Sequence, residues 1–172
     1  ITDDTARALE AFVQQAGVEP GTRVILNSPG GLLEGGMALG DTIRRLGLQT
    51  DIGRRVGTGR YTRIARGACE SACGTAYLGG TFRHLFPGST FGVHRYWTTD
   101  RAQDTVEDGQ IMTAELITYV TRQGASPDLV TRIAQTPASR MENLPVGELL
   151  AMHVVTRSEE HTSELQSQFR IS

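Results

Sequence analysis

A short apolar run that ends at a proline and two glycines constrains the fold of this chain more than any other feature. Val24-Ile25-Leu26 is continuously hydrophobic, as expected for a strand buried on both faces of a parallel sheet. Asn27-Ser28-Pro29-Gly30-Gly31 ends the run, and the helical spacing of Leu39, Ile43 and Leu46 follows it. Strands that alternate with helices build α/β domains. The sequence therefore predicts an α/β fold.

Further helix and strand patterns alternate along the chain. Asp3 or Asp4 can cap a helix that ends at Gly17, and Ser126-Pro127-Asp128 marks the start of another. Apolar spacing predicts the remaining helices at 72–78, around 112–120 and at 146–151. The other predicted strands are 49–56, 91–94 and 154–155, with a loop or irregular strand over 57–67.

The composition limits the classes of protein to which the chain can belong. Its 172 residues suit one domain, and no apolar run approaches the ~20 residues of a membrane-spanning helix. The formal net charge of −2 gives no case for nucleic acid or anionic lipid as the main partner. The two cysteines, without a second pair of ligands, make a poor zinc site. We therefore expect no metal and no cofactor.

Both ends of the sequence have unusual features. The chain begins at Ile1 without a methionine and enters a helical pattern at once, so we expect a fragment that lacks its first strand. The eleven residues Arg157–Ser167 resemble the in-frame translation of a common sequencing adapter. We therefore predict one domain over residues 1–156 and a non-native tail over 157–172 that packs poorly against it.

A serine among small residues is the first candidate catalytic group. Ser71 precedes the short predicted helix 72–78, so it lies at the positive end of the helix dipole and beside the free N–H of Ala72. Attack by a serine hydroxyl creates negative charge, which those groups stabilise. The alternative is a serine that only caps the helix, which is the commoner role.

The paired glycines Gly30 and Gly31 are the second candidate. After Pro29 they let backbone N–H groups face a cleft without a Cβ in the way. Such donors can hold an oxyanion or a phosphate. The segment is not a Walker loop, because no Gly-Lys-Ser/Thr follows it. The alternative is a turn between strand and helix with no further role.

His94 is the candidate general base. It lies in the predicted strand 91–94, and a base must reach the nucleophile in space, which spacing along the chain cannot show. His84, in a loop-like setting, and His153, near the last predicted strand, are rivals. A histidine with a purely structural role is the alternative.

Taken together, these segments resemble the Clp protease proteolytic subunit and its relatives in the ClpP/crotonase superfamily. Asn27–Gly31 matches the family's Asn-Ser-Pro-Gly-Gly, and Gly67 stands four residues before Ser71 as the family has it. Gly80 closes the following helix, and His94 comes at the end of the expected hydrophobic strand. The resemblance covers residues 1–156.

The resemblance implies a fold, an activity and a site. The fold would be the ClpP/crotonase-like spiral of β-β-α units, N-terminally truncated, and the activity would be serine-dependent peptide hydrolysis without a cofactor. Ser71 would be the nucleophile, His94 the general base, and the N–H groups of Gly31 and Ala72 the oxyanion hole. The partners would be a peptide or protein substrate and, in a homo-oligomer, further copies of the chain.

The third member of the catalytic triad departs from the family. The family's aspartate should fall near Thr136–Pro137, where this chain has no carboxylate. Asn143 is our first choice for the residue that orients His94, Glu142 the second, and Asp128 is more remote; a neutral partner stabilises imidazolium less than a carboxylate does. The missing aspartate leaves a non-catalytic binding domain open. A crotonase-type acyl-CoA enzyme is a third alternative, against which the Ser–His pair argues.

Cys69 and Cys73 flank Ser71 symmetrically. This pattern is most similar to ClpP-like proteins of bacterial envelopes, whose nucleophile segment carries Cys-x-Ser-x-Cys, and that resemblance implies an envelope location. In a reducing compartment both cysteines would be small buried residues. In an oxidising one they could form a disulfide, if the helix begins late enough for their Cβ atoms to converge. We predict small packing residues.

Overall fold

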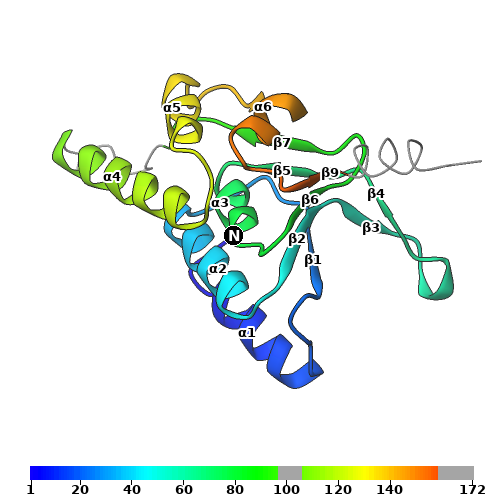
Figure 1. Ribbon diagram of the computed structural model, residues 1–172. Coiled ribbons are helices and arrows are strands. Elements are labelled where there is room, and N and C mark those ends of the chain that lie inside the picture. Colours follow the sequence, from blue (N-terminus) through cyan, green and yellow to red (C-terminus); the bar gives the residue numbers. More distant parts are fainter. Residues whose placement is uncertain (97–105, 159–172) are drawn as a thin grey trace, which may run out of the picture.

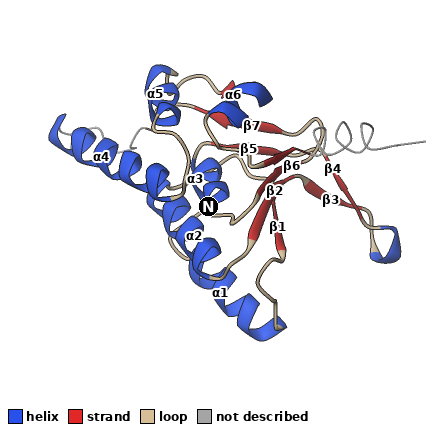
Figure 2. Ribbon diagram, in the orientation of Figure 1, coloured by secondary structure: helices blue, strands red, loops and turns tan. Residues whose placement is uncertain are grey.

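The computed structural model describes residues 1–96 and 106–158 and shows a mixed α/β fold, which confirms the predicted class (Figures 1 and 2). Its helices are α1 (Thr5–Ala16), α2 (Leu33–Arg45), α3 (Ala72–Leu78), α4 (Val106–Arg122), α5 (Asp128–Gln135) and α6 (Val146–Ala151). Its strands are β1 (Arg23–Leu26), β2 (Gln49–Ile52), β3 (Arg54–Val56), β4 (Arg63–Ala65), β5 (Ala68–Glu70), β6 (Arg83–Leu85), β7 (Thr90–Val93), β8 (Glu142–Asn143) and β9 (Arg157–Ser158). None of the helices described is long and apolar enough to cross a membrane.

The strands form two sheets and a separate hairpin of β3 and β4. In the first sheet β1, β2, β6 and β9 pair in that order, all parallel. In the second, β5 pairs parallel with β7, and β8 adds antiparallel to the other side of β7. Beyond the end of β1, Ser28 pairs with Cys69 of β5, and its N–H donates to Ala68 O at 2.9 Å. The chain after β1 therefore runs alongside the second sheet.

Glycines allow α2 and α3 to pack closely, and Figure 1 shows the two helices side by side. A Cβ at Gly36 would overlap Thr75 Oγ1, and one at Gly40 would overlap the hydroxyl of Tyr119 in α4. Gly79, which follows α3, lies against the backbone of Gly40 in the same way. Interiors are packed to the density of organic crystals, so no larger residue fits at these positions without a shift of backbone.

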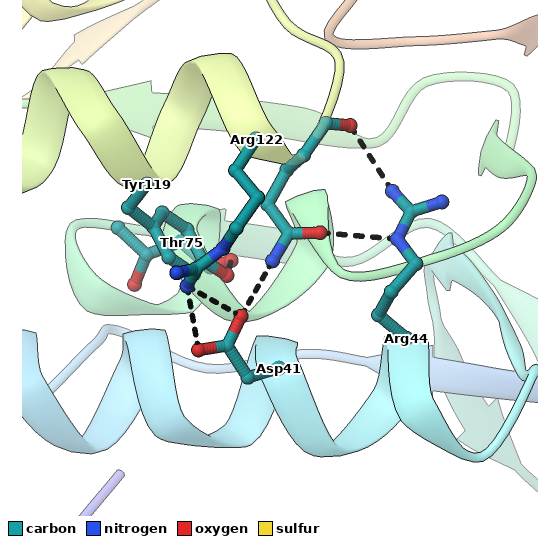
Figure 3. Close-up of polar contacts among 6 residues, drawn as sticks. Asp41, Arg44, Thr75, Tyr119 and Arg122 are labelled. Carbon is teal, nitrogen blue, oxygen red and sulfur yellow. Dashed lines mark hydrogen bonds and ion pairs between the residues drawn. The ribbon is translucent and has the colours of Figure 1, made fainter.

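Polar side chains hold α4 against α2 and α3 (Figure 3). The Tyr119 hydroxyl donates to Thr75 O at 2.6 Å, and burial raises the pKa of this phenol above its usual range, so it stays a neutral donor. Arg122 Nη2 and Gln123 Nε2 both donate to the Asp41 carboxylate of α2, each at 2.7 Å. These contacts fix α4 where it forms a wall of the cavity described below.

The predicted helices are confirmed, but the predicted cap of the first one is wrong: Asp4 precedes α1, its side chain makes no capping hydrogen bond, and its carboxylate instead accepts a hydrogen bond from Arg7. α1 ends at Gly17, which adopts the left-handed conformation with φ 62°. α3 and α6 occupy the predicted ranges 72–78 and 146–151. α5 begins where Ser126 predicts it, since the Asp128 N–H donates to Ser126 Oγ at 3.2 Å.

Several strand predictions are wrong in part. β1 is half-buried and not buried on both faces, because it is the edge strand of the first sheet. The predicted strand 49–56 breaks at Gly53 into β2 and β3, and the segment 57–67 supplies β4, which pairs with β3. The predicted strand 91–94 ends at Val93, so His94 follows the strand.

The prediction of a last strand at 154–155 is wrong. The N–H groups of Val154 and Val155 donate to Leu149 O at 2.8 and 3.2 Å, so these residues close the end of α6 instead of joining a sheet. The backbone of Arg157–Ser158 pairs with β6 in their place, just beyond the predicted domain boundary at Thr156. The remainder of the predicted tail, 159–172, lies outside the described residues.

The sequence does not predict β6, because this strand carries charged and polar side chains into the interior. Arg83 is buried and donates to the carbonyl oxygens of Leu78, Gln123, His153 and Val154 at 2.6–3.1 Å. Burial lowers the pKa of its guanidinium to about 10, so the group stays charged at neutral pH. Arg83 thereby ties together the chain segments that follow α4 and α6 and the end of α3.

Candidate active site

Three parallel segments end side by side at the carboxyl-terminal end of the strands of the second sheet. Glu70 of β5 is in register with Gly92 of β7, and the segment after β1 lies on the other side of β5. Ser71 follows β5 directly, with its N–H donating to Gly92 O at 3.0 Å, and His94 lies two residues beyond Gly92. Neighbouring strands lie about 4.8 Å apart. The fold therefore brings Ser71 and His94 to the same edge, where α/β proteins commonly bind ligands.

Ser71 holds a backbone conformation that L-residues rarely adopt. Its φ is 55° and its ψ −126°. Such a conformation costs on the order of 1–3 kcal/mol and persists only when the surrounding structure enforces it. The Ser71 hydroxyl makes no capping hydrogen bond to α3, which argues against the helix-capping alternative. A strained strand-to-helix turn that presents an unused hydroxyl is a geometry typical of nucleophiles.

A disulfide joins Cys69 of β5 to Cys73 of α3 across Ser71. Both residues are fully buried, and their Cα atoms lie 5.2 Å apart. The prediction of two unlinked packing residues is therefore wrong. Because α3 begins only at Ala72, the turn at Ser71 places Cys73 back over the end of β5, within bonding range of Cys69. The bond fixes the chain on both sides of the strained serine.

Gly30 lies directly against the Ser71 turn, and Gly31 lies against the backbone of Ile1. Their φ angles are 110° and 142°, which favour glycine. A Cβ at Gly30 would lie 2.8 Å from Ser71 Cβ and 3.2 Å from Ala72 N, so the loop approaches as closely as two backbones can. Within residues 1–96 and 106–158, neither the Gly31 N–H nor the Ala72 N–H donates a hydrogen bond. Two free donors therefore lie in the two segments that meet at Ser71.

These groups line one cavity of about 650 Å³. Ser71, Ala72, Gly31 and His94 all line it. The rest of the wall is mainly apolar and comes from the start of α2 with the residue before it, and from α3, α4, α5 and β7. Its apolar members are Leu32, Leu33, Leu78, Phe91, Val93, Met112, Leu116, Val120, Leu129 and Ile133. Asp108 in the first turn of α4 also lines the cavity, although no sequence motif marks it.

His94 is half-buried, and no described residue forms a hydrogen bond that orients its ring. Its Nδ1 is buried and has no hydrogen-bond partner among the described residues. No hydrogen bond joins Ser71 Oγ to His94 in the same part of the chain. The segment after His94 is held by its backbone, because the Arg95 N–H donates to Thr136 O at 2.9 Å.

The candidates for the third triad position lie on β8, next to β7. Glu142 is in register with Val93, and its carboxylate accepts hydrogen bonds from Arg132 Nη2 and Thr136 Oγ1, both at 2.9 Å. Asn143 is in register with Gly92 and is exposed. In the described structure neither side chain hydrogen-bonds to His94. Thr136, at the position where the resemblance expects the aspartate, is buried beside the backbone of Arg95 and bonded to Glu142.

The rival histidines lie away from this cavity. His84 is buried in β6 rather than in a loop, and a hydrogen bond of 2.9 Å joins its Nε2 to Gln49 Oε1. His153 is exposed after α6, with a φ of 55°. Neither residue lines the cavity that contains Ser71.

No group of three or more His, Cys, Asp or Glu side chains in the described residues could hold a metal ion. Comparison of the sequence with protein-family models and with curated proteins finds no match. The function must therefore be argued from the site itself.

Proposed function

We propose that the protein is a serine-dependent peptide hydrolase with the ClpP/crotonase-like spiral fold. The observation that carries the proposal is the strained, uncapped Ser71 at the wall of a large cavity. A non-glycine residue in this conformation is a structural cost, and strained residues cluster at functional sites. The free N–H groups of Gly31 and Ala72, and His94 in the wall of the same cavity, supply the other parts that acyl transfer requires.

In the proposed reaction Ser71 Oγ attacks the carbonyl carbon of the scissile bond while His94 takes the hydroxyl proton. The carbonyl oxygen becomes an oxyanion, which accepts hydrogen bonds from the Gly31 and Ala72 N–H groups. Each such donor contributes on the order of 3 kcal/mol. The tetrahedral intermediate collapses, His94 gives its proton to the leaving amine, and water then hydrolyses the acyl-enzyme by the same steps.

Asn143 remains the first choice for orienting His94. Its exposed carboxamide has no hydrogen-bond partner among the described side chains, whereas Glu142 is already bonded to Arg132 and Thr136. An amide can fix the tautomer of an imidazole but stabilises the imidazolium less than a carboxylate does. We therefore expect slow turnover.

The cavity wall favours an apolar substrate group beside the scissile bond. Met112, Leu116 and Ile133 line the cavity together with Ser71. Burial of a large apolar side chain there contributes about 1.5–3 kcal/mol. Peptides with Leu, Phe or Met before the scissile bond should therefore be cleaved faster than those with Asp or Lys.

A non-catalytic binding domain is the second candidate. It is favoured by His94 Nδ1, which is buried without a partner among the described residues, and by the missing Ser71–His94 hydrogen bond there. Such a domain would use the same cavity to hold an apolar segment without cleaving it.

Hydrolysis of fluorogenic peptides by the purified chain separates the two candidates. We expect slow cleavage of substrates with a large apolar residue before the scissile bond, abolished by Ser71→Ala and reduced at least about a hundredfold by His94→Ala. Ser139→Ala, which changes an exposed serine away from the cavity, is the matched control and should leave the rate unchanged. Cleavage that survives Ser71→Ala would refute the proposed mechanism, and peptide binding without cleavage would favour the binding domain.

A further inference from the structure

The hairpin of β3 and β4 carries a dense cluster of positive charge. Residues 54–66, here called the arginine hairpin, contain Arg54, Arg55, Arg60, Arg63 and Arg66 and no acidic residue. All five arginines are exposed. Figure 1 shows the hairpin projecting from the body of the domain, on the side opposite α4. The arginines therefore stand in solvent on a narrow projection.

None of these five arginines has a partner within the described structure. No ion pair or hydrogen bond there involves any of their side chains. Other arginines of the chain are engaged: Arg122 pairs with Asp41, and Arg132 with Glu142. The charge of the arginine hairpin is thus not neutralised by the protein, and it is available to an anionic partner.

The arginines lie on both faces of the arginine hairpin. Opposite residues of an antiparallel pair share a face, so Arg54 and Arg63 lie on one face and Arg55, opposite Ile64, on the other. At the tip, the ring of Tyr61 is 81% exposed next to Arg60. A tyrosine combines an apolar ring with a polar hydroxyl and is enriched where membranes meet water. The arrangement is a projection with cations around it and an amphipathic aromatic at its end.

The rest of the molecule is acidic. The whole chain has a net charge of −2, and removal of the five positive charges of the arginine hairpin leaves −7 on the remainder. A long polyanion such as a nucleic acid would extend past the hairpin along this acidic body and be repelled. Only the tip of the arginine hairpin would contact a flat anionic surface. The hairpin extends up to roughly 20 Å, which exceeds the Debye length of about 8 Å, so salt screens the body from such a surface.

We propose that the arginine hairpin docks the domain on an anionic lipid surface. The arginines would bind headgroup phosphates on both faces of the hairpin, and Tyr61 would enter the interface between headgroups and acyl chains. An acidic peptide bound along one face of the hairpin would leave the cations of the other face unpaired. The net charge of −2 does not show this local positive cluster, because acidic residues elsewhere in the chain offset it.

Sedimentation with vesicles tests the proposal. The probes are vesicles of phosphatidylcholine alone and of phosphatidylcholine with phosphatidylglycerol, at about 0.1 M and about 1 M salt. We expect binding only to the anionic vesicles and only at the lower salt. Each arginine near an anionic surface contributes about fivefold in affinity, so Arg55→Gln/Arg60→Gln/Arg63→Gln should weaken binding on the order of a hundredfold.

Two further variants make the outcome decisive. Arg7→Gln/Arg45→Gln/Arg140→Gln removes the same charge from exposed positions elsewhere and should bind as the wild type does. Replacement of the three hairpin arginines by lysine keeps the charge and should retain most of the affinity. Equal binding to neutral vesicles, equal loss in the control variant, or no vesicle binding at all would overturn the proposal. Tighter binding of an acidic polypeptide or of DNA under the same conditions would also overturn it.

Discussion

The two halves of the candidate active site differ in how firmly the fold holds them. On one side, Ser71 lies between the disulfide-bonded Cys69 and Cys73, and Gly30 packs against it with no room for a side chain. On the other side, His94 follows the last residue of β7, and its buried Nδ1 has no partner among the described residues. The backbone of the proposed nucleophile is therefore held on both sides. The proposed base is brought near by β7, but no described residue fixes the orientation of its ring.

This difference bears on the proposed chemistry. Strain at Ser71 requires continuous support from the backbone around it, whereas a general base needs one well-placed acceptor. Among the described residues no carboxylate orients His94, and His94 moves a proton in both halves of the proposed reaction, so acylation and deacylation should both be slow. Each of the following variants disturbs one half and leaves the other intact.

The largest effect is expected from Gly30→Ala. The new Cβ would meet Glu70 O and Ser71 Cβ, each at 2.8 Å, at a φ of 110°. We expect a loss of about 3 kcal/mol in the free energy of unfolding, measured with urea, and complete loss of peptide cleavage. Gly21→Ala is the matched control: its φ is 84°, but open space surrounds it, so about 1 kcal/mol and unchanged cleavage are expected. Equal effects of the two would show that Gly30 matters only for its φ.

The next effect is expected from Cys69→Ala/Cys73→Ala. The disulfide closes a short loop, for which the chain-entropy relation gives about 2 kcal/mol of stability. We also expect slower acylation, because Ser71 loses the brace on both sides of its strained backbone. Thermal melting and the acylation rate, each with and without a thiol reductant, measure both effects. The double variant is also the control for the reductant: it has no disulfide, so a reductant should change neither its melting temperature nor its acylation rate. An acylation rate equal to that of the oxidised wild type would mean that strand pairing and Gly30 alone hold Ser71.

The smallest effect concerns the orientation of His94. If Asn143 is the positioning residue, Asn143→Asp supplies a carboxylate and should raise kcat by about tenfold with little change in KM. Glu142→Gln should then leave kcat unchanged. If Glu142 is the partner, the pattern reverses, with Glu142→Gln lowering kcat. Unchanged kinetics in both variants would leave His94 without either proposed partner.

The sequence predicts the helices of this fold better than its sheets. Gly17 and the Ser126-Pro127-Asp128 segment mark helix ends by local chemistry, which depends on nearby residues alone. β6 escapes prediction because the carbonyls that Arg83 binds come from remote segments. The strand predicted at 154–155 does not form, because the N–H groups of Val154 and Val155 donate to Leu149 O instead of to a neighbouring strand. Local signals cannot weigh such long-range competition.

The candidate site divides in the same way. Sequence patterns identify Ser71, His94 and the Gly30-Gly31 loop as candidates, because each requires a particular residue type. They do not reveal that β5 and β7 pair in parallel, which is what brings Ser71 and His94 to one edge. The disulfide depends on where α3 begins, and the hydrogen bond of Thr136 to Glu142 depends on how α5 meets β8. These contacts arise only from the tertiary arrangement.

Covalent labelling of Ser71 tests the central claim most directly. The purified chain is treated with a fluorophosphonate, which reacts with activated serine hydroxyls, and peptide mass spectrometry locates the adduct. We expect a single adduct on Ser71, absent from Ser71→Ala and formed much more slowly in His94→Ala and Gly30→Ala. No adduct, or an adduct on another serine that Ser71→Ala does not remove, would contradict the account of Ser71 as a nucleophile.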